Sequence, residues 1–484
     1  MQTKAMPTGR RGFCVPATGI ERAPTASSTI SQETLALPIL RMVYTSPQRH
    51  TAMKTGLDYP STYYASTLSD SHEWPRMSDT IDVEVCVVGG GLAGVATALD
   101  LAERGRSVAL LEQNRIGWGA SGRSGGFVSQ GFHQGLEALL NRFGASFASE
   151  LFMLSEMGHA LVRERIERYK IDCGPIVAGA LSCALSHKPD ALEAYRDMAA
   201  ENFGVSLEYW PKGRVRDVLE TSRYGAALFN PLTFSVHPLN LVRGLAHAVE
   251  TQGGKIFERS PVLHLADSGA RRLVRTARGD VRADHVVLAC GGYIEGLFRV
   301  LSNSTVPVAT YVMVTEPLGD TLNSAIGVPY AISDLQFLPN YYRKLADGRL
   351  LWGGRASGWE YGPRYLTQLL KHDMQSFFPT LKIARIEVGW SGLMSYLSHE
   401  MPALGSLGHG VWYATGFGGL GLAATSMAGR LIGSGIAEKD DRWRLFERFG
   451  LPFTGGGSLA RVLSQLNIWY HSAAESLGRR PSIS

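Results

Sequence analysis

Gly89, Gly91 and Gly94 form a G-x-G-x-x-G pattern, and its spacing suits the binding of a phosphate group. The first glycine of such a turn allows a tight bend, the second lets backbone approach a pyrophosphate, and the third lets a helix pack closely on a strand. Glu112 follows at the end of the next apolar run, where its carboxylate can accept a hydrogen bond from a ribose hydroxyl. These residues predict a dinucleotide site. Glycine turns also occur in purely structural roles, and the acid does not separate NAD from FAD.

The elements around this pattern are those that a dinucleotide site needs. Residues 83–88 are a β-branched run typical of a buried parallel strand, and apolar residues at helical spacing follow from Val95 to Ala102. A second strand is expected from Ser107 to Leu111. The glycine turn would then lie at a helix N-terminus, where unpaired N–H groups and the helix dipole favour a phosphate.

A glycine-rich loop at residues 117–126 follows the second strand and reads GWGASGRSGG. Its backbone amides and Arg123 could lie against a large flat cofactor. This loop resembles the flavin-contact loop of the FAD-dependent glycine/D-amino-acid oxidase superfamily. Within that superfamily the chain is most similar to the γ-glutamylputrescine oxidases, through residues 63–66 (YYAS), 163–173 (including RERI, Tyr169 and IDC) and 237–241 (HPLNL). The resemblance covers roughly residues 60 to 460.

The resemblance implies a set of residues that bind FAD without a covalent link. Two positions depart from the family pattern: Leu420 stands where the family commonly has His, and Gly389 stands where close members carry Arg. Both departures are expected to remove polar groups near the site. The implied cofactor-binding residues are Gly89, Gly91, Leu92, Ala93, Gly94, Glu112, Gln113, Ser121, Gly122, Arg123, Ser124, Gly125, Gly126, Val262, Ala289, Gly291, Gly418, Gly419, Leu420, Gly421 and Leu422.

The resemblance implies that the substrate is an amine, and the chemistry of amine oxidation suggests four further site residues. An alkylamine has a pKa of about 10.4 and is protonated at neutral pH, but only the neutral form has a lone pair that can assist hydride loss. Desolvation between apolar or aromatic walls favours the neutral form. Trp390 and Tyr342 are the candidate walls, and His399 and His237 are candidate proton acceptors. His237 could equally serve packing at the start of a helix, because Pro238 follows it.

The pattern predicts an α/β protein with a Rossmann-type FAD-binding domain and an interleaved α+β substrate domain built on a large β-sheet. The FAD-binding domain is expected at residues 81–130, 235–300 and 390–440, the substrate domain at 131–234 and 301–389, and a C-terminal segment at 441–484. One long helix is expected from Leu136 to Tyr169, and strand and hairpin material from Gly174 to Leu185. Residues 1–56, rich in Ser, Thr, Pro and Arg, are predicted to be a disordered extension.

Composition narrows the classes of protein further. The net charge of +5 comes from scattered residues, which argues against a nucleic-acid surface. No apolar run reaches the 18 or so residues of a membrane span. The five cysteines show no C-x-x-C spacing, which favours reduced thiols in a cytoplasmic protein without a metal site.

We therefore expect an enzyme that oxidises the C–N bond of a small-molecule amine with FAD, with hydrolysis of the imine and reduction of O2 to hydrogen peroxide. One alternative is a flavin dehydrogenase that uses another electron acceptor. A catalytically inactive FAD-binding subunit is the alternative from a different class. The sequence does not name the amine or the oligomeric state.

Overall fold

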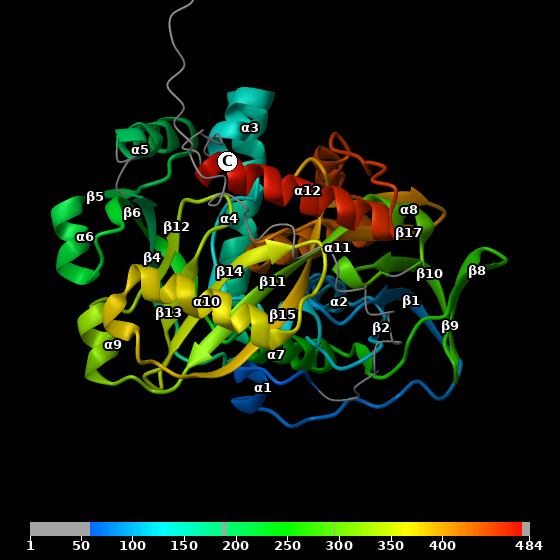
Figure 1. The fold of residues 1–484 in the computed structure, drawn as a ribbon. Coiled ribbons are helices and arrows are strands. Elements are labelled where there is room, and N and C mark those ends of the chain that lie inside the picture. Colours follow the sequence, from blue (N-terminus) through cyan, green and yellow to red (C-terminus); the bar gives the residue numbers. More distant parts are fainter. Residues whose placement is uncertain (1–58, 186–189, 295, 477–484) are drawn as a thin grey trace, which may run out of the picture. The chain divides into compact units, whose positions relative to one another are not determined.

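The structure is a computed structural model that describes residues 59–185, 190–294 and 296–476, all within one compact unit (Figure 1). The extension predicted at residues 1–56 lies outside the described residues. Two large sheets, here called sheet A and sheet B, form the framework. The prediction of an α/β fold with two different sheets is confirmed.

Sheet A has the parallel arrangement that the dinucleotide pattern predicts. Its strand order is β16-β17-β10-β1-β2-β7, and β8 and β9 extend it through β10. The neighbours from β17 to β7 run parallel, with Val88 opposite both Leu111 and Leu288. The strands are β1 (Ile81–Val88), β2 (Val108–Leu111), β7 (Lys255–Phe257), β8 (His264–Ser268), β9 (Arg271–Arg275), β10 (Asp280–Leu288), β16 (Ala403–Gly408) and β17 (Val411–Thr415).

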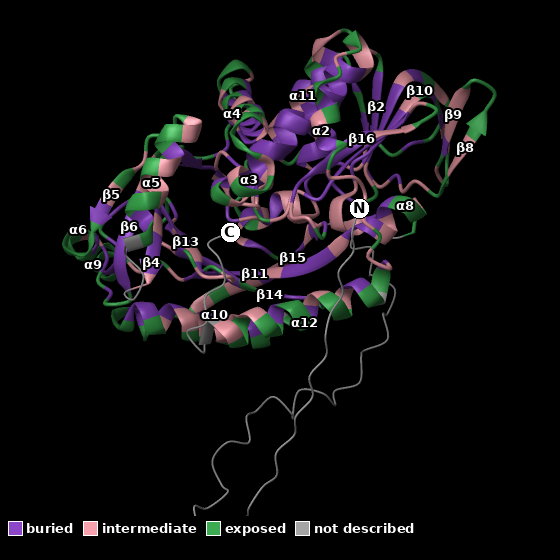
Figure 2. Ribbon diagram, turned by 90° about the horizontal axis from the view of Figure 1, so that it is seen from above, coloured by how far each residue is buried: buried purple, intermediate pink, exposed green. Residues whose placement is uncertain are grey.

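Three helices pack together beside sheet A. These are α2 (Leu92–Glu103), α7 (Pro238–Thr251) and α11 (Gly421–Glu438), and α2 contacts both of the others. Residues 85–88 of β1 are buried, as Figure 2 shows for the central strands of the sheet. This burial explains why residues 85–88 read as a continuous apolar run and not as an alternating one.

Sheet B is almost entirely antiparallel, with the order β15-β11-β14-β13-β12-β4-β6-β3 and β5 paired to β6. The exception is the parallel pair of β12 and β4. The strands are β3 (Phe127–Val128), β4 (Val177–Leu185), β5 (Glu208–Pro211), β6 (Tyr224–Ser235), β11 (Val306–Thr315), β12 (Ala331–Asp334), β13 (Tyr341–Lys344), β14 (Leu350–Ser357) and β15 (Ile386–Tyr396). Strand β15 crosses the domain boundary expected at residue 390 and belongs wholly to sheet B.

Two local predictions need correction. The single helix expected from Leu136 to Tyr169 is two helices, α3 (Leu136–Phe143) and α4 (Ala145–Arg168), because Gly144 adopts a φ of +80° between them. The segment from Gly174 to Leu185 contains a strand, as predicted, but no hairpin; this strand, β4, pairs with β6 and β12. The remaining helices are α1 (Tyr63–Ser66), α5 (Asp190–Phe203), α6 (Lys212–Val218), α8 (Arg299–Ser304), α9 (Asp320–Ala325), α10 (Pro363–Phe377) and α12 (Gly457–Ser476).

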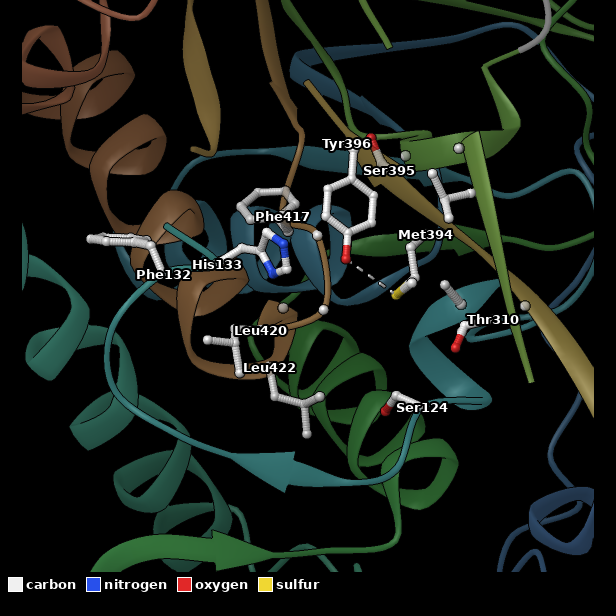
Figure 3. Close-up of a pocket in the computed structure, with 18 of the residues that line it drawn as sticks. Ser124, Phe132, His133, Thr310, Met394, Ser395, Tyr396, Phe417, Leu420 and Leu422 are labelled. Carbon is white, nitrogen blue, oxygen red and sulfur yellow. Dashed lines mark hydrogen bonds between the residues drawn. The ribbon is translucent and has the colours of Figure 1, made fainter. Parts of the chain in front are cut away.

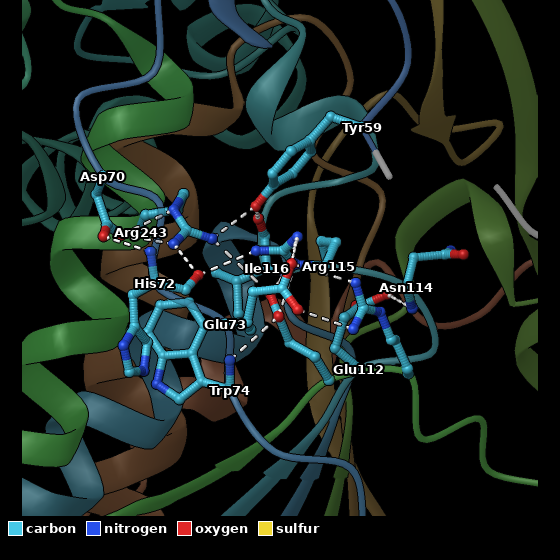
Figure 4. A network of polar contacts seen from close by, with 12 residues as sticks. Tyr59, Asp70, His72, Glu73, Trp74, Glu112, Asn114, Arg115, Ile116 and Arg243 are labelled. Atoms are coloured by element: carbon cyan, nitrogen blue, oxygen red, sulfur yellow. Dashed lines mark hydrogen bonds and ion pairs between the residues drawn. The ribbon is translucent and has the colours of Figure 1, made fainter. Parts of the chain in front are cut away.

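A buried polar network fixes the segment before β1 to the dinucleotide-type half of the fold (Figure 4). Glu258 is fully buried and accepts hydrogen bonds from Arg115 Nε and Ile116 N, both at 2.7 Å. Arg243 donates to Tyr59 Oη at 2.8 Å and also pairs with Asp70. The segment that carries Tyr59 and Asp70 is therefore held against α7 and the loop after β2.

Among the described residues, no helix is both long and apolar enough to cross a bilayer. No group of three or more His, Cys, Asp or Glu side chains in that part of the chain is placed to hold a metal ion.

Candidate active site

A cavity of about 1310 Å³ is lined by residues of both sheets and their connecting loops. From sheet A it receives the loops that follow β1 and β2 and the loop between β17 and α11. From sheet B it receives residues of β4, β6, β11 and β15. Figure 3 shows the part of the cavity beside α11. Of the residues predicted to bind the cofactor, all except Gly94 and Gly122 line this cavity.

The glycine turn has the geometry that a pyrophosphate site requires. Gly89 has a φ of +112°, which an L side chain rarely adopts. A Cβ on Gly94 would lie 1.9 Å from the carbonyl oxygen of Gly89, so this glycine permits the close contact of helix and strand. Gly94 thus supports the site from behind the cavity wall. Helix α2 begins at Leu92, and its first N–H donates to Ser121 Oγ at 2.9 Å.

Glu112 is held in place by backbone donors. Gly90 N donates to Oε2 at 2.6 Å and Asn114 N donates to Oε1 at 2.7 Å. Burial raises the pKa of Glu112 to about 7, although these N–H donors favour its charged form. The side chain lines the cavity, and its contact with a ribose stays a prediction.

The loop at residues 117–126 leaves polar atoms that have no partner in the protein. Arg123 lies over the Trp118 ring at 4.4 Å and donates to the carbonyl oxygens of Trp118 and Ser391. Its Nη2 atom and Ser124 Oγ are buried without a hydrogen-bond partner among the described residues. Buried polar atoms normally have partners, so these two atoms indicate a polar ligand in the cavity. Gly122 shapes the loop, because a Cβ there would lie 2.2 Å from Gly117 O.

The second glycine loop, at residues 416–421, precedes α11. Gly418 has a φ of +55°, and a Cβ there would contact the Tyr396 ring at 3.0 Å and His133 Cβ at 3.3 Å. The N-terminus of α11, from Leu420 to Leu422, lines the cavity. The observed site therefore fits FAD: it combines the phosphate turn, unpartnered polar atoms and a helix N-terminus around one cavity.

The aromatic side chains predicted as substrate walls lie elsewhere. Tyr342 is fully buried, stacks on Trp352 at 4.4 Å and donates to Tyr224 Oη, while its neighbour Tyr341 lines the cavity. Successive side chains of a strand point to opposite faces, so the prediction chose the wrong tyrosine. Trp390 donates from Nε1 to Arg123 O at 2.9 Å and supports the loop at residues 117–126 from outside the cavity.

The two histidines predicted as proton acceptors have structural roles. His237 Nδ1 accepts the N–H of Asn240 as the N-cap of α7, and its Nε2 contacts Thr67 Oγ1 at 3.1 Å. His399 Nδ1 accepts the N–H of Met401, and its Nε2 lies 3.4 Å from Gly450 O. Neither histidine lines the cavity, which corrects the prediction for both.

The expectation for Gly389 is also wrong. A Cβ at this position would lie 2.3 Å from Thr367 Oγ1 of α10, so Gly389 packs against a helix and does not border the cavity. Leu420 does line the cavity. Of the two departures from the family pattern, only the one at Leu420 therefore lies at the cavity.

Sequence reasoning missed several residues that the fold brings into the cavity. His133 and Tyr396 meet there edge to face, with ring centroids 4.9 Å apart (Figure 3). Thr310 and Asp334 come from sheet B, and α12 contributes a further side of the lining. No motif marks these residues. Only the pairing of sheet B and the position of α12 bring them together.

Comparison with known proteins defines the class. The family of FAD dependent oxidoreductases (DAO) matches residues 84–434. The chain belongs to this family, which confirms the predicted family, the fold class and FAD as the cofactor of an oxidoreductase.

Particular relatives refine the comparison. The chain is 33% identical over 427 residues to the gamma-glutamylputrescine oxidoreductase of Escherichia coli (strain K12), covering 87% of this chain and 99% of that protein. It is 30% identical over 421 residues to a probable oxidoreductase OrdL of Haemophilus influenzae, covering 86% and 97%. Glycine oxidase from Geobacillus kaustophilus has a solved structure with a TM-score of 0.62 at 23% identity, covering 74% of this chain and 95% of that one; this likeness supports the fold.

Proposed function

We propose that the chain is an amine oxidase that acts on a γ-glutamylputrescine-like amine. The carbon next to the amine nitrogen loses a hydrogen with two electrons, and the resulting imine is hydrolysed to an aldehyde or ketone. Molecular oxygen takes up the two electrons with two protons and becomes hydrogen peroxide. The relative that is a gamma-glutamylputrescine oxidoreductase supports this choice of substrate class.

The charge of the cavity is the observation that carries the proposal. A carboxylate next to the reacting carbon would call for an arginine, which binds carboxylates with two parallel hydrogen bonds. Arg355 is already occupied in this way by Asp373, with both N–O distances at 2.7 Å. Arg123 has an unpartnered Nη2 atom, but it belongs to the loop at residues 117–126 that is predicted to contact the flavin. Among the described lining residues, the acids are Glu112, Glu137, Asp334 and Glu400, and the bases are Arg123, Arg355 and His133.

This balance favours a cationic amine over an α-amino acid. Acidic side chains attract an ammonium group into the cavity, and Arg355, the lining arginine of sheet B, already pairs with Asp373. A γ-glutamylated amine would reach the site with its amine end, while its one free carboxylate remains many bonds away from the reacting carbon.

The protein's own groups would prepare the amine for oxidation. FAD, when bound, supplies the acceptor for two electrons and one hydrogen from the substrate carbon. Phe132, Phe417, Leu420 and Leu422 give the cavity an apolar wall, which favours the neutral form of an amine over its cation. The N-terminus of α11 favours negative charge at the cavity wall.

A cytoplasmic location is part of the proposal. The four described cysteines, Cys86, Cys173, Cys183 and Cys290, form no disulfide. Reduced thiols suit the cytoplasm.

Anaerobic mixing of the purified holoenzyme with candidate substrates tests the proposal. γ-Glutamylputrescine and putrescine should bleach the flavin absorbance, and γ-glutamylputrescine should do so fastest. Sarcosine and D-alanine carry a carboxylate next to the reacting carbon and should bleach it at least about tenfold more slowly, the effect of roughly 1.4 kcal/mol. Faster bleaching by sarcosine or D-alanine would contradict the choice of an amine.

A further inference from the structure

Among the described residues His133 makes no hydrogen bond to the protein, in contrast to His237, His399 and His159. Its ring lines the cavity, while His237 and His399 use both ring nitrogens in contacts with the fold. His159 likewise contacts Leu232 O at 3.0 Å. Within the described residues, neither ring nitrogen of His133 has a hydrogen-bond partner. A histidine that the fold does not engage is available to a ligand.

The His133 ring lies where the glycine loop at residues 416–421 meets sheet B. The Tyr396 ring, from β15, lies edge to face with it at 4.9 Å and 78°. The glycine between them, Gly418, would bring a Cβ within 3.3 Å of His133 and 3.0 Å of Tyr396. Figure 3 shows His133, Tyr396 and Phe417 grouped beside the loop that carries Leu420.

The groups that act on His133 leave its ring neutral at physiological pH. Burial lowers the pKa of His133, and the negative charge of Glu400 partly opposes that shift. Tyr396 is the titratable side chain that faces it from β15; burial raises the pKa of Tyr396, so this hydroxyl stays neutral. The loop from Phe417 to Leu422 contributes no titratable side chain. A neutral imidazole can accept a proton, whereas an imidazolium cannot.

We propose that His133 binds the substrate ammonium group and accepts its proton, with Tyr396 orienting the ring. This inference rests on the proposed amine oxidation. The proton moves from the ammonium nitrogen to a ring nitrogen, and the N–H bond electrons stay on the amine as its lone pair. The lone pair would then assist loss of the hydrogen and two electrons from the neighbouring carbon, for which bound FAD would be the acceptor, and the substrate would become an iminium ion. The imidazolium is stabilised by Glu400 until it returns its proton to water.

The pH profile of flavin reduction separates this role from a structural one. With wild-type holoenzyme and limiting γ-glutamylputrescine under anaerobic conditions, the rate should rise at low pH as His133 deprotonates and stay flat from about pH 7 to 9. Between pH 7 and 9 the amine stays protonated and His133 stays neutral. The reacting pair therefore holds the same number of protons throughout this range, and its rate does not change with pH. In His133→Gln the enzyme must capture the neutral amine, so the rate should be lower and increase about tenfold per pH unit, since the amine pKa is about 10.4.

Two controls make the profile decisive. His159→Gln makes the same substitution at a buried histidine outside the cavity and should keep the wild-type profile. Flavin content and melting temperature report whether His133→Gln folds, and His133→Asn replaces it if it does not. A variant profile that is as flat as the wild-type one overturns the role of His133. Failure of γ-glutamylputrescine to bleach wild-type flavin instead counts against the proposed function.

A measurement without turnover tests His133 independently of the substrate. tert-Butylamine has no hydrogen on the carbon next to nitrogen and cannot be oxidised there. Its addition to the holoenzyme should shift the NMR signals of the His133 ring. In the absence of the amine, His133 should titrate below the ordinary histidine pKa of about 6.5. In Glu400→Gln that pKa should fall further. Unchanged ring signals, or a His133 pKa at or above 6.5, would overturn the proposal.

Discussion

Gly91 has an ordinary φ of −81°, so its missing side chain matters for space and not for backbone conformation. A Cβ at this position would lie 2.9 Å from Ser121 Oγ, on the cavity side of the phosphate turn. The loss of cofactor binding after substitution can therefore be separated from strain in the backbone.

Gly91→Ala should lower the affinity for FAD by about tenfold or more. The added methyl group crowds Ser121 and the space expected for the pyrophosphate, and such overpacking costs about 1–3 kcal/mol. Gly213→Ala is the matched control, because its Cβ would meet no atom within 4 Å. Flavin release by equilibrium dialysis measures both variants. Equal affinities for the two would remove Gly91 from the cofactor site.

Glu112 should make the stability of the flavin-free protein depend on pH. Burial raises its pKa to about 7, above the value in the unfolded chain, so its contribution to stability is greatest below about pH 4.3. That contribution is lost as the pH rises through about 7. We therefore expect the melting temperature of the wild type to fall relative to that of Glu112→Gln as the pH rises from 5 to 8. A constant difference across this range would show that Glu112 does not titrate there.

At the level of elements, strand periodicity explains which residues the sequence could place. The strand, turn, helix and strand at residues 81–111 are local and strongly patterned, so the cofactor half of the site was predictable. The sequence could not predict which face of β13 points into the cavity. Tyr341 and Tyr342 are both aromatic, and the register of sheet B decides which of them lines the cavity. His133 carries no pattern of its own, since only tertiary packing brings it to Tyr396.

Helix α12 is the element whose contribution to the cavity sequence reasoning missed. It packs against β11 and β14, and Ala460, Ser464 and Asn467 line the cavity. It lies close to the end of β14: Gly358 N donates to Gln465 Oε1 at 3.0 Å. A segment assigned only as C-terminal in sequence thus forms one wall of the candidate active site.

Gly358→Ala should loosen α12. The new Cβ would lie 2.3 Å from Arg461 O, which is backbone and cannot turn away as a side chain would. The expected cost is about 1–3 kcal/mol, seen as faster amide hydrogen exchange in residues 457–476. Because α12 lines the cavity, the KM for the amine should also rise. Gly362→Ala, whose Cβ would meet nothing within 4 Å, should leave both quantities unchanged. Identical exchange in the two variants would contradict this packing.

At the scale of the described molecule, the two sheets supply different parts of the candidate active site. Sheet A is assembled from residues 81–111, 255–288 and 403–415, and its loops supply the phosphate turn and the start of α11. Sheet B is assembled mainly from the stretches between them and supplies Thr310, Tyr341 and Tyr396. Arg343 ties the two halves together, since it donates from Nε to Gly125 O and from Nη2 to Val236 O. A cofactor bound by the loops of sheet A would thereby lie against the part of the cavity that sheet B lines.

The stoichiometry of a single anaerobic turnover tests the central claim most directly. The flavin-loaded protein is reduced with one equivalent of γ-glutamylputrescine, air is admitted, and aldehyde and hydrogen peroxide are both quantified. We predict complete bleaching followed by one aldehyde and one hydrogen peroxide for each amine consumed. Retained flavin colour in the presence of the amine, or reoxidation without hydrogen peroxide, would contradict an amine oxidase that uses oxygen.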